Sequence, residues 1–136
     1  MKKIVSIFMV AIMLICYSTT VSAATSQTNE IMPLWDNITQ VTNTISFSGS
    51  NGSVHCSVLG DAGTTVTAQV KVYRQTASGA WSYVGGDSGS SSTNSLYLTV
   101  NFTAKSGAYY KSVLTTTVNK NGVEEDATKT TYKTCP

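Results

Sequence analysis

From Ile38 onward, apolar and polar residues alternate along the chain with a period of two. In "TTVTAQVKVYRQ" the apolar positions are Val66, Ala68, Val70 and Val72, and polar residues stand between them. A period of two is that of a β-strand with one buried face. Comparable runs recur between turn residues about every 8–12 positions, which is typical of a β-sandwich or barrel.

Seven candidate strands follow from this pattern. They are "NITQVTNTISFSG", "GSVHCSVLG", "TTVTAQVKVYRQ", "WSYVGG", "SLYLTVNF", "AYYKSVLTTTVNKNG" and the last run, residues 123–135. We expect "DSGSSSTNS" to be a polar, flexible loop and "NKNG" to be a hairpin turn. The last run alternates poorly, so we expect a bulge or an edge position there. Each strand has one apolar face to cover, which favours two antiparallel sheets packed face to face.

The N-terminus has the three parts of a secretory signal peptide. Lys2 and Lys3 precede an apolar run over residues 4–16, and small residues follow at 21–23. The run is shorter than the roughly 20 residues that span a bilayer. We therefore expect a signal peptide helix over residues 1–23, a lead-in segment over 24–36 and the sandwich over 37–136, with cleavage after Ala23 or Ala24. A buried N-terminal helix is the alternative.

Removal of the signal peptide changes the charge and the composition of the chain. The full sequence carries nine basic and seven acidic residues. Loss of Lys2 and Lys3 balances them, and a neutral surface does not steer toward phosphate polymers, so we expect no nucleic-acid partner. Ser and Thr make up close to a third of the remainder, which suits the exposed faces of strands. A disordered Ser/Thr-rich stalk is the alternative, although such stalks lack regular alternation.

Two cysteines remain beyond the signal peptide, namely Cys56 and Cys135. An even number of cysteines in an exported chain favours a disulfide, so we expect these two to be joined. The closed loop would span 79 residues, and closing a loop of that length stabilises a fold by about 4 kcal/mol. Cys16 falls in the signal peptide and lacks the small preceding residue of a lipidated cysteine. Two free thiols are the alternative.

No pattern of catalytic or metal-ligating residues emerges from the sequence. His55 is the single histidine, beside a cysteine that we expect to be oxidised, so neither a catalytic triad nor a zinc site can be assembled. The acidic cluster at residues 124–126 alternates between the two faces of a strand, and we expect it to be solvated. Asp61 and Asp87 fall in predicted turns or edges rather than across a cleft. We therefore predict no enzyme activity, no metal and no cofactor.

Aromatic residues are the best candidates for a binding site. Tyr73 ends one predicted strand and Trp81 begins the next across the "TASGA" turn. Together with Tyr83 and Tyr97 they form the predicted ligand platform. Exposed aromatic faces beside amides and hydroxyls suit a sugar or a peptide. The alternative is that these rings cover the rim of the sandwich as cross-strand pairs.

Two resemblances suggest a family. The segment "YYKSVLTTTVNKNG" resembles the penultimate strand and hairpin of fibronectin type III and related immunoglobulin-like domains. This resemblance implies that Tyr110 is a corner tyrosine, whose hydroxyl bonds to nearby backbone. The wider chain resembles uncharacterised small secreted proteins of Gram-positive bacteria, through "W-x-N-I" at 35–38, a cysteine in the second strand, "V-x-R-Q" at 72–75 and "KTCP". It implies an all-β, single immunoglobulin-like β-sandwich and no activity.

Three functions fit these expectations. The first is a secreted, extracellular and non-catalytic module that binds an unknown protein or glycan, monomeric and away from the membrane once the signal peptide is cleaved. The second is a small exported antibacterial or competition factor. The third is a structural component of a surface assembly.

Overall fold

The computed structural model describes residues 34–136, which lie within one compact unit that extends over Met32–Pro136. The predicted signal peptide, Cys16 and most of the lead-in segment lie outside the described residues. Seven strands follow in order: β1 (Ile38–Ser48), β2 (Asn51–Gly60), β3 (Thr65–Gln75), β4 (Trp81–Ser91), β5 (Ser95–Thr103), β6 (Tyr109–Lys120) and β7 (Val123–Thr134). Residues 34–136 contain no helix long and apolar enough to cross a membrane.

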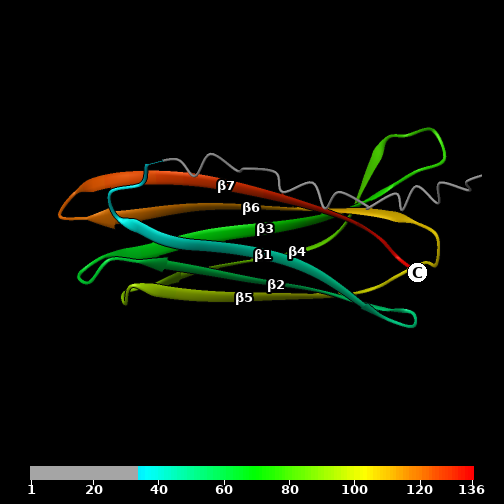
Figure 1. The fold of residues 1–136 in the computed structure, drawn as a ribbon, viewed down its shortest axis with the longest axis horizontal. Coiled ribbons are helices and arrows are strands. Elements are labelled where there is room, and N and C mark those ends of the chain that lie inside the picture. Colours follow the sequence, from blue (N-terminus) through cyan, green and yellow to red (C-terminus); the bar gives the residue numbers. More distant parts are fainter. Residues whose placement is uncertain (1–33) are drawn as a thin grey trace, which may run out of the picture. The chain divides into compact units, whose positions relative to one another are not determined.

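The strands form two antiparallel sheets, so the predicted all-β sandwich of seven strands is confirmed. One sheet has the order β1-β2-β5 and the other β4-β3-β6-β7. In Figure 1 the two sheets lie face to face, with their strands running along the length of the domain. The fourth strand pairs with β3, whereas in a constant-type immunoglobulin domain it joins the sheet of the first two strands.

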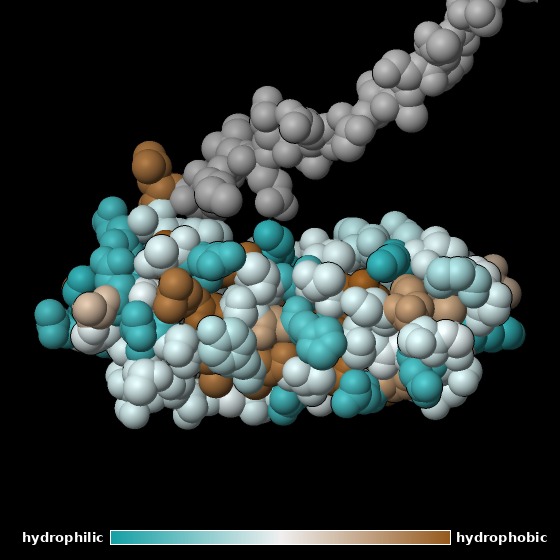
Figure 2. Space-filling model, turned by 60° about the horizontal axis from the view of Figure 1, so that its bottom comes forward, coloured by the Kyte–Doolittle hydropathy of each residue, from teal (hydrophilic) through white to brown (hydrophobic). Residues whose placement is uncertain are grey.

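The inward faces of both sheets supply the core that the alternation predicted. Val66, Val70 and Val72 of β3 are completely buried, as are Leu114 and Val118 of β6. The three-stranded sheet faces them with a second set of buried side chains: Ile45, Val54, Cys56, Val58, Leu98 and Val100. Figure 2 shows one face of the exterior, where hydrophobic residues appear as small separate spots among hydrophilic ones. The apolar side chains that the pattern assigned to the interior therefore do lie there.

The Tyr110 side chain closes one end of this core. It is completely buried, and its ring lies against Phe47 and Phe102 at centroid distances of 5.4 and 5.1 Å. The Lys105 backbone N–H donates a hydrogen bond of 2.9 Å to the Tyr110 hydroxyl. The bond that the resemblance implied for a corner tyrosine is therefore present.

The hairpin between β6 and β7 is the turn predicted from "NKNG". Lys120 pairs with Val123, so Asn121 and Gly122 form a two-residue loop. Both have positive φ, at 55° and 85°. Asn and Gly tolerate this left-handed conformation better than other residues, which is why the dipeptide fixes the turn.

The prediction of a loop at "DSGSSSTNS" was wrong over its first half, because residues 87–91 extend β4. The long strand β3 continues alongside and holds them in register, from Asp87 opposite Val70 to Ser91 opposite Val66. A β-carbon built on Gly89 would lie 3.3 Å from Leu98 of the other sheet. Residues 87–91 have no apolar side chains, but they form a strand because their backbone pairs with that of the buried strand β3.

A bulge or an edge position was expected for the last strand, and β7 does lie at the edge of its sheet. It pairs with β6 without a bulge. Alternate side chains of β7 donate hydrogen bonds to carbonyl groups of β1, the edge strand of the other sheet. The bonds join Lys129 Nζ to Val41 O (3.3 Å), Thr131 Oγ1 to Asn43 O (2.7 Å) and Lys133 Nζ to Ile45 O (3.2 Å). Polar side chains of β7 therefore face the edge strand β1, where apolar residues would be expected, which explains why residues 123–135 alternate poorly.

The predicted disulfide between Cys56 and Cys135 is not formed; both cysteines are free and buried. Cys56 pairs with Asn43 in the middle of β1. Asn43 in turn lies beside Thr131 of β7, whose hydroxyl donates to its carbonyl. Cys135 comes four residues after Thr131, or about 13 Å farther along an extended chain, whereas bridged Cα atoms lie within about 7 Å. The register between β1 and β7 joins strands far apart in the chain and could not be predicted from the alternation, so this separation was not foreseen.

Candidate ligand-binding surface

The outer face of the four-stranded sheet brings aromatic side chains from four strands together. Register places Tyr83 of β4 opposite Tyr73 of β3, Tyr73 opposite Lys111 of β6, and Lys111 opposite Tyr132 of β7. Side chains of directly paired residues lie on the same face of a sheet. One row across the sheet therefore consists of three tyrosines and a lysine.

Trp81 and Tyr109 extend this row toward the end of the sheet. The Trp81 ring lies 5.9 Å from Tyr109 and 6.1 Å from Tyr132, and Tyr109 stacks on Tyr132 at 5.8 Å. Tyr73 and Tyr83 meet edge to face at 5.9 Å. These distances lie in the range of favourable aromatic pairs. We call the set Tyr73, Trp81, Tyr83, Lys111, Tyr109 and Tyr132 the aromatic surface.

The Lys111 ammonium group lies among these rings. Its Nζ atom is 4.4 Å from the centre of the Trp81 ring and 5.0 Å from that of Tyr73. A cation over the face of an aromatic ring is attracted by the electron density of that face. Tyr83 and Tyr132 are nevertheless 61% and 52% exposed, so rings on both sides of Lys111 remain accessible to a ligand.

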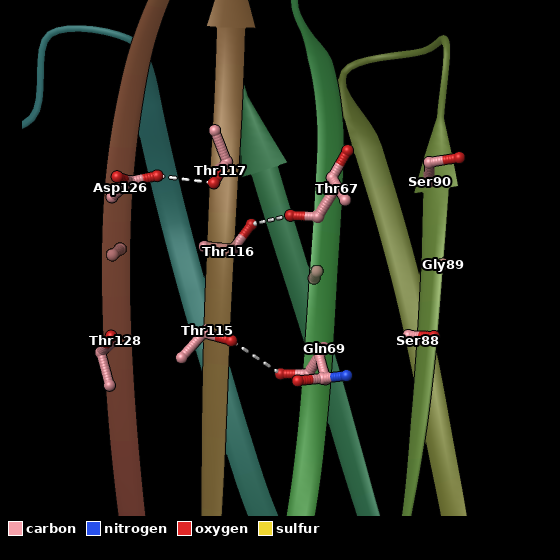
Figure 3. Close-up of a pocket in the computed structure, with 12 residues that line it drawn as sticks. Thr67, Gln69, Ser88, Gly89, Ser90, Thr115, Thr116, Thr117, Asp126 and Thr128 are labelled. Carbon is pink, nitrogen blue, oxygen red and sulfur yellow. Dashed lines mark hydrogen bonds between the residues drawn. The ribbon is translucent and has the colours of Figure 1, made fainter.

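Beyond the aromatic surface, the same sheet face carries hydroxyl and amide groups. Figure 3 shows them on β7, β6, β3 and β4, around a shallow hollow of about 690 Å³. Hydrogen bonds hold three of the threonines: Thr115 and Thr116 donate to the Gln69 and Thr67 carbonyls, and Thr117 donates to Asp126. We call the outward members the hydroxyl grid: Thr67, Gln69, Ser88, Ser90, Thr115, Thr117, Asp126 and Thr128.

The structure brings together three of the four residues of the predicted platform and separates the fourth. Tyr73, Trp81 and Tyr83 belong to the aromatic surface. Tyr97 lies on β5 in the three-stranded sheet, opposite Ser57, and is 75% exposed. The prediction grouped exposed aromatic residues without knowing which sheet each strand joins, and that assignment separates Tyr97 from the others.

Tyr109, Lys111 and Tyr132 were absent from the predicted platform. A signal for two of them was present, because a two-residue hairpin at Asn121 and Gly122 fixes the register on both sides. Counting back from this turn places Lys111 opposite Tyr132. The pairing of β3 with β6, which places Tyr73 beside Lys111, joins strands far apart in the chain and had no such signal.

The remaining chemically active side chains do not assemble into a site. His55 lies exposed on β2, where its Nδ1 is 3.3 Å from the Thr99 hydroxyl. Within residues 34–136, no group of three His, Cys, Asp or Glu side chains is arranged to hold a metal ion. Glu125 was expected to be solvated, but its carboxylate accepts hydrogen bonds from three backbone N–H groups at residues 36–38, at 2.7–2.9 Å. It fixes the start of β1.

The buried Cys56 thiol belongs to a small polar network in the core. It lies 3.5 Å from Asn43 Oδ1, which also accepts a 2.8 Å hydrogen bond from the Ser112 hydroxyl. The Asn43 amide donates to the carbonyls of Ser112 and Lys129. Burial raises the pKa of Cys56 to about 11, so the thiol is protonated and unreactive at neutral pH.

Comparison with known proteins gives no relative for this chain: no protein-family model and no curated protein matches it. The resemblance to fibronectin type III domains and to small secreted Gram-positive proteins therefore stays a prediction.

Proposed function

We propose that the protein is a secreted, non-catalytic module that binds a glycan on the outer face of its four-stranded sheet. The observation that carries the proposal is the aromatic surface. Five aromatic side chains from four strands form two groups, Tyr73 with Tyr83 and Trp81 with Tyr109 and Tyr132, with ring-to-ring distances of 5.8–6.1 Å within each group. Lys111 lies over a ring of each group and joins the two. Exposed rings of this kind offer flat apolar faces next to phenol groups that form hydrogen bonds.

The surroundings of the rings support a sugar as the ligand. A sugar presents apolar C–H faces and a rim of hydroxyl groups, and it needs both stacking faces and hydrogen-bond partners. The hydroxyl grid supplies such partners along the same strands, through Ser, Thr and Gln side chains. A broad, shallow face of this kind suits an extended chain of several sugar units better than a single small molecule, which favours a deep pocket.

Alanine substitution in a glycan-binding assay tests the proposal. We expect the purified chain to bind at least one polysaccharide in a panel screened at up to about 100 μM sites. Trp81→Ala and Tyr109→Ala should weaken that binding at least tenfold. Tyr97→Ala removes a more exposed ring from the other sheet and is the control, with affinity unchanged. Equal loss in Tyr97→Ala, or no binding to any polysaccharide, would refute the proposal.

The secretory part of the proposal is supported by the order of charge, apolar run and small residues at the N-terminus. N-terminal sequencing of protein from the culture medium tests it. We expect the mature chain to begin at Ala24 or Thr25. Recovery of the chain only inside cells with its first residues intact would contradict it.

A second candidate function, a component of a surface assembly, is favoured by strand β4. It forms an edge of its sheet, and its second half, residues 87–91, is made of Ser, Gly and Asp. Unprotected edges pair readily with other strands. Sedimentation over a range of concentrations tests this function: assembly that Ser90→Pro abolishes would support it, and a monomer at all concentrations would exclude it.

A further inference from the structure

We infer that the glycan is anionic, with carboxylate or sulfate groups that bind in a basic groove at the end of the aromatic surface. This inference rests on the proposed function and adds the chemical class of the ligand. The groove has a volume of about 450 Å³ and is formed by the β3–β4 hairpin and the β5–β6 loop. Its charged lining residues are Arg74 and Lys105, and no acidic residue lines it.

The groove adjoins the aromatic surface around the end of the four-stranded sheet. Arg74 pairs with the buried Tyr110, so its side chain leaves the sheet on the face opposite to that of Tyr73. Gln75 lines the groove and pairs with Trp81 across the β3–β4 hairpin. On the other side, Ala108 lines the groove and directly precedes Tyr109. Gln75 and Ala108 thus mark the end of the sheet that the groove shares with Trp81 and Tyr109, and a polysaccharide that extends past these two rings reaches the groove around that end.

The cations at this end of the molecule have charge available for a ligand. Neither Arg74 nor Lys105 forms a salt bridge with another residue of the described part of the chain, and Lys111 is held over aromatic rings rather than beside a carboxylate. A guanidinium and two ammonium groups without counter-ions attract an anion. The arrangement therefore combines ring faces with uncompensated positive charge.

Acidic side chains gather at the opposite end. Asp61 forms a 3.3 Å salt bridge with Lys120, where β6 ends. Glu124, Glu125 and Asp126 follow directly after the β6–β7 hairpin. Figure 1 shows that this hairpin and the β5–β6 loop lie at opposite ends of the domain. The charges nearly balance over the chain, but their separation leaves the aromatic end positive and orients an anionic polymer toward it.

Two matched pairs of polysaccharides isolate the contribution of charge. Polygalacturonate and its methyl ester share one backbone and differ in their carboxylates, and dextran sulfate and dextran differ in their sulfates. We expect the purified chain to bind at least one anionic polymer at least tenfold more tightly than its neutral counterpart. That preference should shrink as salt rises from about 0.05 to 0.5 M, because salt screens exposed charges.

Charge-removing variants locate the contact. The double variant Arg74→Gln/Lys105→Gln should lower affinity for the preferred anionic polymer about tenfold and leave that for the neutral one unchanged. Lys111→Gln should act in the same direction. Lys120→Gln removes the same charge at the far end and is the control, with less than a twofold effect. Equal effects of the far and near substitutions would overturn the inference, because the groove would then have no special role.

The outcomes separate this inference from the proposed function. Equal binding of neutral and anionic polymers, both lost in Trp81→Ala, would overturn the anionic class and leave the glycan-binding function standing. No binding to either member of both pairs, or to any polysaccharide in the wider panel, would overturn both. Binding of poly-glutamate as tightly as polygalacturonate, unaffected by Trp81→Ala, would overturn the assignment of the groove to a sugar and indicate an acidic peptide.

Discussion

The phenol oxygen of Tyr110 accepts a 2.9 Å hydrogen bond from the backbone N–H of Lys105, five residues earlier in the chain. The bond ties the β5–β6 loop to the buried ring and shapes one wall of the basic groove. Tyr110→Phe keeps the ring and removes this acceptor, so we expect the free energy of unfolding to fall by about 1 kcal/mol. Tyr109→Phe, next to it on the exposed face, should change it by less than about 0.5 kcal/mol. Urea denaturation measures both, and equal effects would contradict the prediction.

The Asn43 side chain is expected to be the most sensitive polar group of the core. Its side-chain oxygen accepts a hydrogen bond from the Ser112 hydroxyl, and its side-chain amide donates to the backbone carbonyls of Ser112 and Lys129. Asn43→Ala leaves the Ser112 hydroxyl without its acceptor and removes the amide donor to both carbonyls, and we expect the chain to lose about 3 kcal/mol of stability. Ser112→Ala alone should cost less.

A double-mutant cycle separates the network from simple loss of volume. The combined Asn43→Ala/Ser112→Ala variant should be more stable than the sum of the two single effects predicts, by about 0.5–2 kcal/mol, because the two residues share a bond. Strict additivity in chemical denaturation would show that the bond contributes nothing.

Glu125 is expected to hold the start of β1 in place. Its two carboxylate oxygens accept hydrogen bonds from the backbone N–H groups of Asp36, Asn37 and Ile38. Glu125→Gln removes the charge and one acceptor, so we expect a loss of about 1–2 kcal/mol. Amide exchange at residues 36–38 should accelerate locally. Glu124→Gln, an exposed neighbour, is the control, and similar acceleration in that variant would count against the assignment.

The two cysteines are expected to be reduced and protected in the native chain. Both are buried and unbridged. Brief alkylation of native protein without a reductant should leave the peptides that contain Cys56 and Cys135 largely unmodified, whereas alkylation after denaturation should modify both. A peptide pair that remains joined after denaturation would show a disulfide, and the register described above would then be wrong.

Stability should fall at alkaline pH through Cys56. Burial raises the pKa of its thiol from 9.0 to about 11. Above pH 9 the unfolded chain therefore releases this proton more readily than the native chain, so the contribution of Cys56 is complete below pH 9 and is lost as the pH rises to about 11. Cys56→Ala should be less stable at pH 7 but should lose less stability between pH 9 and 11. Parallel curves for the two proteins would contradict this account.

Strands with one buried face were predictable because the residues that point into the core are apolar and those that point to solvent are polar. In β3, each of four alternate apolar residues is at most 3% exposed. The Asn121–Gly122 turn was predictable for a different reason, since few other residues accept positive φ. Strand β4 was not fully predictable, because its second half is held by the backbone of β3 rather than by apolar side chains.

The candidate site was predictable only in part, for the same physical reason. Tyr73 and Trp81 lie on two strands joined by a short hairpin, and the sequence placed them on one face. Lys111 and Tyr132 become neighbours of Tyr73 only through the pairing of β3 with β6. Between the end of β3 at Gln75 and the start of β6 at Tyr109 lie 33 residues. Hydrogen bonds between strand backbones are nearly independent of the side chains, so such distant pairing leaves little trace in sequence.

The alternation of apolar and polar residues was enough to predict antiparallel strands with one buried face each, and the Asn121–Gly122 dipeptide was enough to predict where the chain reverses its direction. Which sheet each strand joins became known only from the folded chain. That choice removed Tyr97 from the aromatic surface, added Lys111 and Tyr132 to it, and kept Cys56 away from Cys135. The reason is that the polarity of each residue indicates whether that residue is buried, whereas the order of strands in a sheet depends on how all the strands of the domain pack together.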